Sequence, residues 1–146
     1  MRDNPWDGGL TFVAPDTTTY DQEAADQIGL DPSLVYKTLL VSIDTKTLVV
    51  AVVPVGRQLS LKALAKAAGG KKANMAEKAL AERGTGYLLG GISPIGQKRR
   101  MDTFVDRSAE ALHRLFVCAG RRGTEIELSP ADLQRATNAR FYDLVS

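Results

Sequence analysis

The sequence predicts a single domain of the α+β class with a mixed central sheet. Stretches with the composition of strands outnumber strong helical stretches, and the two kinds follow one another in an irregular order. This order disfavours a doubly wound parallel sheet, in which strands and helices alternate. A chain of 146 residues is long enough for one sizeable core. We therefore expect residues 1–146 to form one domain, with residues 1–9 as a loose arm.

The clearest strands are Val35–Ile43 and Leu48–Val53, which are separated by a hairpin-sized connection at residues 44–47. The second stretch is apolar at every position, which predicts a central strand that is covered on both faces. Shorter strands are expected at Leu10–Ala14, Thr103–Val105, Leu115–Ala119 and Glu125–Leu128.

Helices are predicted from their capping signals. A serine, threonine or aspartate before an apolar-periodic stretch marks a beginning, proline is favoured at the first position, and glycine marks an end. These signals predict a helix over Tyr20–Ile28, a single turn after Asp31, a helix over Leu61–Ala68 capped by Ser60, a helix over Ala76–Arg83 ended by Gly84, and a last helix opened by Ser129 and Pro130.

The composition is that of an ordinary soluble protein, with 44% hydrophobic and 25% charged residues. No apolar run approaches the roughly 20 residues that span a bilayer, and the first residues lack a signal-peptide pattern. A single cysteine cannot form an internal disulfide, so we expect a cytoplasmic protein without membrane contact. The net charge of +2 is too small to indicate nucleic-acid binding by itself.

Lys37 is the first candidate for a functional residue. Side chains alternate along a strand, so Lys37 shares a face with Val35, Leu39, Val41 and Ile43. An ammonium group on such an apolar face is costly unless it has a partner or lines a cleft. The alternative is a lysine whose methylene groups follow the sheet while its charge reaches solvent at the rim.

A glycine-rich loop at residues 90–96, Gly-Gly-Ile-Ser-Pro-Ile-Gly, is the second candidate. It is not a nucleophile elbow, because the glycine required two residues after Ser93 is absent. It is not a Walker A loop either, because Gln97 stands where the lysine belongs. What remains is a stiff turn whose backbone amides can approach an oxygen closely, or else a plain surface turn.

Other polar candidates are weaker. Cys118 and His113 are five residues apart, so one strand would direct them to opposite faces, and a lone cysteine in an apolar strand is usually part of the core. Three short basic clusters, which contain Lys71-Lys72, Lys98-Arg99-Arg100 and Arg121-Arg122, are each next to glycine. Together they form a possible surface for a phosphate backbone, although such clusters are usually only solvated.

Four segments together resemble one family. Val35–Leu39, Leu48–Pro54, Thr85–Lys98 and Ile126–Leu133 are similar, in the same order, to the YbaK group, the free-standing relatives of the editing domain of bacterial prolyl-tRNA synthetase. The similarity extends from about Glu23 to the C-terminus. The resemblance implies a largely antiparallel central sheet with flanking helices.

The resemblance also implies an activity. The family removes wrongly attached amino acids from tRNA, most typically cysteine from tRNA-Pro. A second, hydrolytic selection is needed because binding alone discriminates side chains that differ by one methylene by only about 1–3 kcal/mol. Mischarged tRNA and prolyl-tRNA synthetase are the partners that the resemblance implies, and no cofactor or metal is expected.

The resemblance assigns roles to particular residues. Lys37 matches the family's hallmark lysine, and Gly91 with its neighbours is expected to hold the ester carbonyl oxygen as it gains charge. The remaining substrate-binding residues are expected to be Tyr36, Thr38, Gly90, Ile92, Ser93, Gly96 and Cys118, of which Cys118 replaces a small hydroxyl residue. The expected tRNA-binding residues are Lys98, Arg99, Arg121 and Arg122.

No protein nucleophile is required by this interpretation. In the cysteine-editing members the thiol of the substrate is thought to attack its own ester, and the pocket holds thiol and carbonyl in line. The alternative function is a non-catalytic module that binds a tRNA acceptor end or a synthetase. A nucleotide or phosphate enzyme is disfavoured by the failed Walker comparison.

Overall fold

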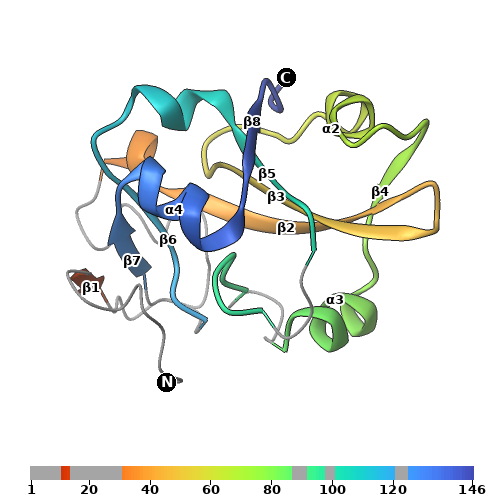
Figure 1. The fold of residues 1–146 in the computed structure, drawn as a ribbon, viewed down its shortest axis with the longest axis horizontal. Coiled ribbons are helices and arrows are strands. Elements are labelled where there is room, and N and C mark those ends of the chain that lie inside the picture. Colours follow the sequence, from red (N-terminus) through yellow and green to blue (C-terminus); the bar gives the residue numbers. More distant parts are fainter. Residues whose placement is uncertain (1–10, 14–30, 87–91, 98–100, 121–124) are drawn as a thin grey trace.

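The computed structural model describes residues 11–13, 31–86, 92–97, 101–120 and 125–146. These residues form two sheets with helices packed around them (Figure 1). The larger sheet has five strands in the order β4-β2-β3-β5-β8, and the smaller has three in the order β1-β7-β6. The predicted helix at residues 20–28 and the predicted loose arm at residues 1–9 lie outside the described residues.

The hairpin of β2 (Tyr36–Ile43) and β3 (Thr47–Pro54) is the centre of the larger sheet, as predicted. Asp44 and Thr45 at its tip have φ angles of 53° and 54°, and the amide of Lys46 donates to the carbonyl oxygen of Ile43 at 3.0 Å. Two consecutive positive φ angles match the right-handed twist of the flanking strands. The tight turn therefore sets the register of the whole hairpin.

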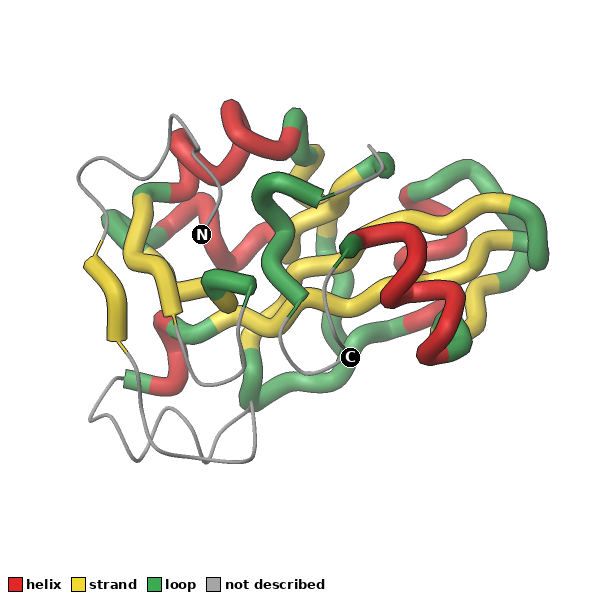
Figure 2. Tube along the Cα trace, turned by 90° about the horizontal axis from the view of Figure 1, so that it is seen from below, coloured by secondary structure: helices red, strands yellow, loops and turns green. Residues whose placement is uncertain are grey.

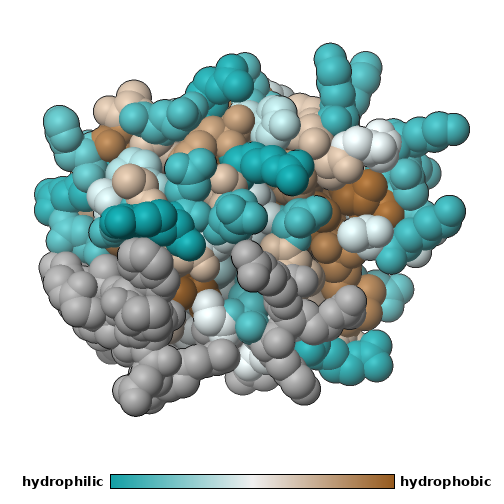
Figure 3. Space-filling view, in the orientation of Figure 1, coloured by the Kyte–Doolittle hydropathy of each residue, from teal (hydrophilic) through white to brown (hydrophobic). Residues whose placement is uncertain are grey.

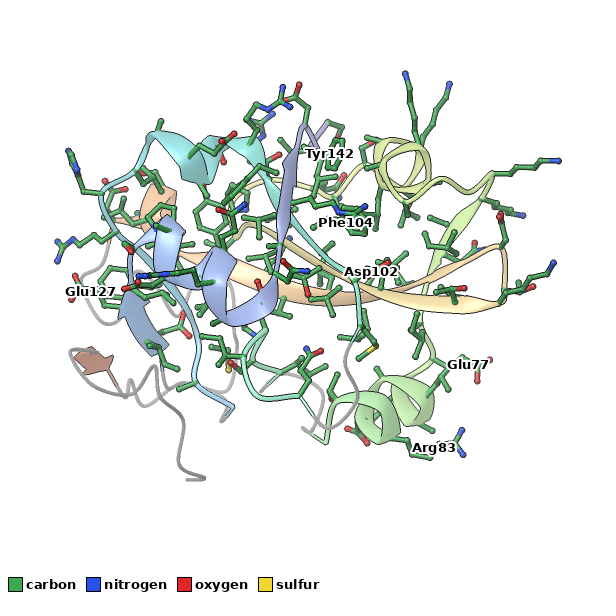
Figure 4. The ribbon with its side chains drawn as sticks, viewed as in Figure 1. Glu77, Arg83, Asp102, Phe104, Glu127 and Tyr142 are labelled. Atoms are coloured by element: carbon green, nitrogen blue, oxygen red, sulfur yellow. The ribbon has the colours of Figure 1, made fainter. Side chains whose placement is uncertain are left out.

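The other strands of this sheet pair in both directions. β4 (Ala73–Met75) is antiparallel to β2, whereas β5 (Thr103–Asp106) is parallel to β3, and β8 (Arg140–Tyr142) is parallel to β5. The rings of Phe104 and Tyr142 approach to 5.9 Å between centroids across β5 and β8 (Figure 4). β4 and β8 were not predicted, because neither three-residue stretch lies within a longer apolar run of the kind that marks Leu10–Ala14.

A separate hydrophobic core covers each face of the larger sheet. α2 (Leu61–Ala67) and α3 (Lys78–Thr85) lie on opposite sides of the sheet (Figure 1). The α2-side core contains Val41, Ile43, Val49, Ala51, Val53, Leu64, Ala65 and Phe104. The α3-side core includes Tyr36, Leu40, Val50, Val52, Ala81, Ile92, Ile95, Val117 and Leu133. The residues of β3 from Val50 to Val53 are 0% exposed, which confirms the prediction of a central strand covered on both faces.

The smaller sheet consists of β6 (Leu115–Cys118), β7 (Glu125–Leu128) and β1 (Thr11–Val13), all paired antiparallel. All three strands agree with the sequence prediction to within one residue at each end. Val35, which directly precedes β2, forms a parallel bridge with Phe116 of β6 and so connects the two sheets. Figure 2 shows long strands running through the middle of the molecule and shorter strands at one end of it.

Most capping predictions are confirmed. The side chains of Ser60 and Ser129 accept hydrogen bonds at the start of α2 and of α4 (Pro130–Thr137), and Asp31 caps the short 3-10 helix η1 (Pro32–Leu34). The predicted end of α3 at Gly84 is wrong. Gly84 is inside α3 and buried, and the helix ends at Gly86, whose φ of 80° is the left-handed conformation that glycine favours. A second 3-10 helix, η2 (Arg107–Ala111), was not predicted.

Candidate active site

One edge of β2 is divided between two partners. The strand pairs with β3 along its whole length on one side. On the other side Val35 bridges to β6, and residues 41–43 pair with β4. The amide of Ala76 donates to the carbonyl oxygen of Leu40 at 3.0 Å, which extends the β4 side by one residue. Beyond the bridge, residues 37–39 have no strand partner on this side among the described residues, and we call this segment the open edge of β2.

Thr38 presents its peptide group to the open edge. The carbonyl of Leu40 and the amide of Asp44 face the β4 side, whereas the carbonyl of Val35 faces the β3 side and accepts from the amide of Val55, directly after β3. Peptide groups of alternate residues in a strand point to opposite edges, so the N–H and C=O of Thr38 point to the open edge. Its Oγ1 atom is buried and has no hydrogen-bond partner in the described part of the chain. Buried polar groups in this state are rare, and binding of a ligand is one explanation for them.

Lys37 and Cys118 lie level with each other where β2 and β6 diverge. The strands run parallel, so two residues beyond the bridge between Val35 and Phe116 the register brings Lys37 opposite Cys118. The hydrophobic clusters support this register. Val35 and Phe116 belong to one buried cluster, and the next residues along each strand, Tyr36 and Val117, belong together to the α3-side core. Lys37 and Cys118 therefore leave their strands on the same face. Lys37 is half-buried and Cys118 is 0% exposed.

Glu125 adds a buried acidic residue to this group. It pairs with Cys118 across β6 and β7, so the two side chains share a face, and it is 1% exposed. Glu125 was not predicted as a site residue, because the alternation of glutamate with Ile126 and Leu128 is typical of an outward-facing polar side. β7 is the middle strand of the smaller sheet, where Glu125 is opposite Cys118 of β6 and Val13 of β1, and its burial depends on tertiary contacts that the sequence pattern does not report.

The described part of the glycine-rich loop lies on the opposite face of β2. Ile92 and Ile95 belong to the α3-side core together with Tyr36. Strand alternation places Thr38 on this face and Lys37 on the other. At the open edge of β2, the side chains of Lys37 and Cys118 are therefore on one face of the strand, and the side chain of Thr38 is on the other face.

Hydrogen bonds within the loop hold its conformation. The Ser93 hydroxyl accepts from the amide of Ile95 at 3.2 Å, and the side-chain amide of Gln97 donates to the carbonyl oxygen of Ser93 at 3.0 Å. Gly96 has a φ of 68°, which explains why glycine stands there. Gly96 also lines an open hollow of about 390 Å³ between the loop and α4, on the side of Arg135 and Thr137. Ser93 is 1% exposed, so its side chain is part of the packed loop.

Tyr36 is anchored in the core beside the site. Its ring is 1% exposed, and its hydroxyl lies 2.7 Å from the Ser108 hydroxyl. Ser108 in turn donates to a carboxylate oxygen of Asp106 at 2.6 Å, and the other oxygen accepts from the amide of Leu144 at 2.9 Å. Burial raises the pKa of Tyr36, the hydrogen bond to Ser108 lowers it, and the negative charge of Asp106 raises it. The network connects the start of β2 to β5 and to the C-terminal segment.

The structure describes seven of the predicted site residues and brings several of them to one strand edge. Lys37, Thr38 and Cys118 surround the open edge of β2, whereas Tyr36, Ile92 and Ser93 are packed in the interior next to it. Gly96 lies in the more distant part of the loop. The other predictions, Gly90, Gly91, Lys98, Arg99, Arg121 and Arg122, fall outside the described residues.

The described residues contain no group of three or more metal-ligating side chains that is suited to a metal ion. Across the same ranges, no helix is long and apolar enough to cross a membrane. His113 is exposed and precedes β6. It therefore lies at the surface.

Comparison with known proteins gives a consistent result. The model of the aminoacyl-tRNA editing domain family matches residues 14–136. EbsC of Enterococcus faecalis, a candidate Cys-tRNA(Pro)/Cys-tRNA(Cys) deacylase, is 39% identical over 126 residues, which are 86% of this chain and 76% of EbsC. YwhH of Bacillus subtilis is 25% identical over 121 residues, which are 83% of this chain and 76% of YwhH.

Solved structures share the fold. A candidate trans-editing enzyme for prolyl-tRNA synthetase superposes with a TM-score of 0.85 at 22% identity, covering 95% of this chain and 88% of the other. The hypothetical protein APE2540 superposes with a TM-score of 0.83 at 25% identity, covering 94% and 91% of the two chains. These similarities confirm the predicted α+β fold.

Proposed function

The chain belongs to the aminoacyl-tRNA editing domain family, and we propose that within this family it removes cysteine from mischarged tRNA-Pro. Membership in the family makes it an aminoacyl-tRNA deacylase, which is an ester hydrolase. The observation that carries the proposal is the open edge of β2, where Lys37 and the buried hydroxyl of Thr38 flank unpaired strand backbone. The similarity to EbsC supports cysteine as the amino acid.

Each group at the open edge has a role in this proposal. The ammonium group of Lys37 binds oxygens of the ester or of the terminal ribose and phosphate. The peptide group and the hydroxyl of Thr38 bind the aminoacyl end, and the glycine-rich loop holds the carbonyl oxygen as it becomes negatively charged. Cys118 and Glu125 are buried next to the open edge, on the face of β2 that carries Lys37.

The substrate supplies the nucleophile. The thiol loses its proton as its sulfur adds to the ester carbonyl carbon, the bond from this carbon to the ribose oxygen breaks, and the ribose oxygen takes up that proton. The four-membered thiolactone that results is opened by water to free cysteine. Holding sulfur and carbonyl carbon in line makes the addition step effectively unimolecular, and such positioning supplies much of the rate. Alanine and serine lack the thiol, so alanyl- and seryl-tRNA are expected to react more slowly.

The proposal is tested with purified protein and a panel of tRNA-Pro charged with cysteine, alanine or serine. Lys37→Ala should lower kcat/KM for Cys-tRNA-Pro by about 10²–10³-fold, the usual cost of losing a group that stabilises transition-state charge. Lys78→Ala, at an exposed position of α3, is the matched control and should retain full activity. If all three tRNAs remain intact, the chain is not a deacylase of tRNA-Pro. Salt-sensitive tRNA binding without turnover would favour the non-catalytic module.

A role in translation fidelity implies a place in the cytoplasm together with prolyl-tRNA synthetase. The synthetase releases the mischarged tRNA that the deacylase consumes, so contact between the two proteins would shorten the life of the error. Titration of the synthetase against labelled protein, with and without tRNA-Pro, measures this contact. Absence of association under both conditions would show that the deacylase acts on released tRNA alone.

A further inference from the structure

Exposed lysines gather around α2 and the tip of the β2–β3 hairpin. Lys62 and Lys66 are four residues apart in α2, so they share its outer face, opposite the buried residues Leu64 and Ala65. We call the whole set the α2 lysine face: Lys46, Lys62, Lys66, Lys71 and Lys72, all of which are exposed. Figure 3 shows hydrophilic side chains projecting from this part of the molecule, and in Figure 4 several long side chains there end in nitrogen.

The hairpin tip fixes the loop that carries two of these lysines. The carboxylate of Asp44 accepts hydrogen bonds from the backbone amides of Lys72 at 2.8 Å and Lys71 at 3.0 Å. These bonds, that of Lys72 first, lower the pKa of Asp44. At Gly70 a Cβ atom would lie 2.3 Å from Cγ2 of Ile43, so glycine is needed for the loop to approach the hairpin so closely. The lysines therefore extend from a well-supported backbone.

The positive charge of this face is not neutralised within the described structure. The ion pairs among the described residues are made by Arg107, Arg114 and Arg135, and the α2 lysine face takes part in none of them. Asp44 and Asp102 are the carboxylates that line the adjoining hollow. Five positive charges against these two carboxylates give this region an excess of positive charge, whereas the whole chain carries only +2.

The α2 lysine face lies on the same side of the sheet as Lys37. α2 packs on the face of β2 that carries Val41 and Ile43, and strand alternation places Lys37 on that face as well. Ile43 is six positions after Lys37 in β2, which corresponds to about 20 Å at about 3.3 Å per residue. A polyanion that enters the open edge at Lys37 can therefore continue along this side to the lysines.

We propose that the α2 lysine face binds the phosphate backbone of the tRNA acceptor arm while the aminoacyl end occupies the open edge of β2. The identity of the polyanion rests on the proposed function. The aminoacyl ester itself cannot reach lysines about 20 Å away, so they contact phosphates several nucleotides before the 3′ end. Lysine side chains neutralise phosphates without reading sequence, so this face supplies affinity rather than the choice of amino acid.

The test compares two variants that each remove two exposed positive charges from one helix. Lys62→Gln/Lys66→Gln alters α2, and Lys78→Gln/Arg83→Gln alters α3, where Arg83 points away from the molecule (Figure 4). Binding of uncharged tRNA-Pro is measured by fluorescence anisotropy at several salt concentrations. The α2 variant should bind roughly tenfold more weakly at 0.1 M salt, with a salt slope about 1.4–1.8 smaller, as two phosphate contacts are lost. The α3 variant should bind like the unaltered protein.

Hydrolysis adds a second measurement. The α2 variant should lose activity on full-length Cys-tRNA-Pro through a higher KM, but retain it on a short cysteinylated oligonucleotide that ends in CCA. Unchanged tRNA binding by the α2 variant, or an equal loss in the α3 variant, would overturn the assignment of this face. If neither substrate is hydrolysed while tRNA binding still depends on Lys62 and Lys66, the proposed activity is wrong but the binding face stands. Circular dichroism confirms that both variants are folded.

Discussion

Replacing Thr38 with valine exchanges a hydroxyl for a methyl group of nearly the same shape. Because the Oγ1 atom is buried without a partner in the described structure, the folded state bears the cost of dehydrating it, which is about 1–3 kcal/mol. Thr38→Val should therefore raise the free energy of unfolding by about 1 kcal/mol. For a chain of this size that corresponds to an increase in Tm of roughly 2–4 °C.

The same substitution should impair hydrolysis. If the hydroxyl bonds to the aminoacyl end, its removal costs about 1–3 kcal/mol of transition-state binding, or about a 5- to 150-fold decrease in kcat/KM for Cys-tRNA-Pro. A variant that is more stable but less active would show that the buried hydroxyl of Thr38 destabilises the free protein and contributes to activity.

Stability is measured by urea and thermal unfolding, and activity by release of labelled cysteine. Thr85→Val is the matched control for stability, because the buried hydroxyl of Thr85 donates to the carbonyl oxygen of Ala81 at 2.8 Å. This control should lose about 1 kcal/mol. A Thr38→Val protein that unfolds more easily would show that the hydroxyl is bonded within the chain. An unchanged kcat/KM would show that it does not contact substrate, and either result refutes the reasoning.

Three further predictions concern residues that support the site. Asp106→Ala removes a buried carboxylate that accepts three hydrogen bonds, so urea unfolding should show a loss of about 3 kcal/mol; a loss below about 1 kcal/mol would contradict the network. Burial raises the pKa of Tyr36 above 10.0, so the unfolded chain ionises first, and stability should fall as the pH rises above about 10. Tyr36→Phe should remove this part of the alkaline decline, and an identical decline would exclude Tyr36 as its source. Gly70→Ala places a methyl group 2.3 Å from Cγ2 of Ile43 and should cost about 1–3 kcal/mol, which an unchanged Tm would disprove.

Local signals in the sequence were sufficient to predict most of the helices and strands that the structure describes. The β2–β3 hairpin follows from two apolar stretches and a short connection, and the start of α4 follows from Ser129 and Pro130. These features depend on contacts between residues a few positions apart, which is the range that a pattern reports. The position of Lys37 on the same face as Val41 and Ile43 was predictable for the same reason, because strand alternation is local.

The arrangement of the candidate site was decided by contacts between distant parts of the chain. The bridge between Val35 and Phe116 brings Lys37 level with Cys118, and the pairing of β6 with β7 buries Glu125 beside them. The sequence by itself determined which face of its strand each of the candidates Lys37 and Thr38 occupies, because alternation along a strand is local. The tertiary structure alone decided which strand edge stays open, because edge pairing depends on hydrogen bonds between segments that local composition does not specify.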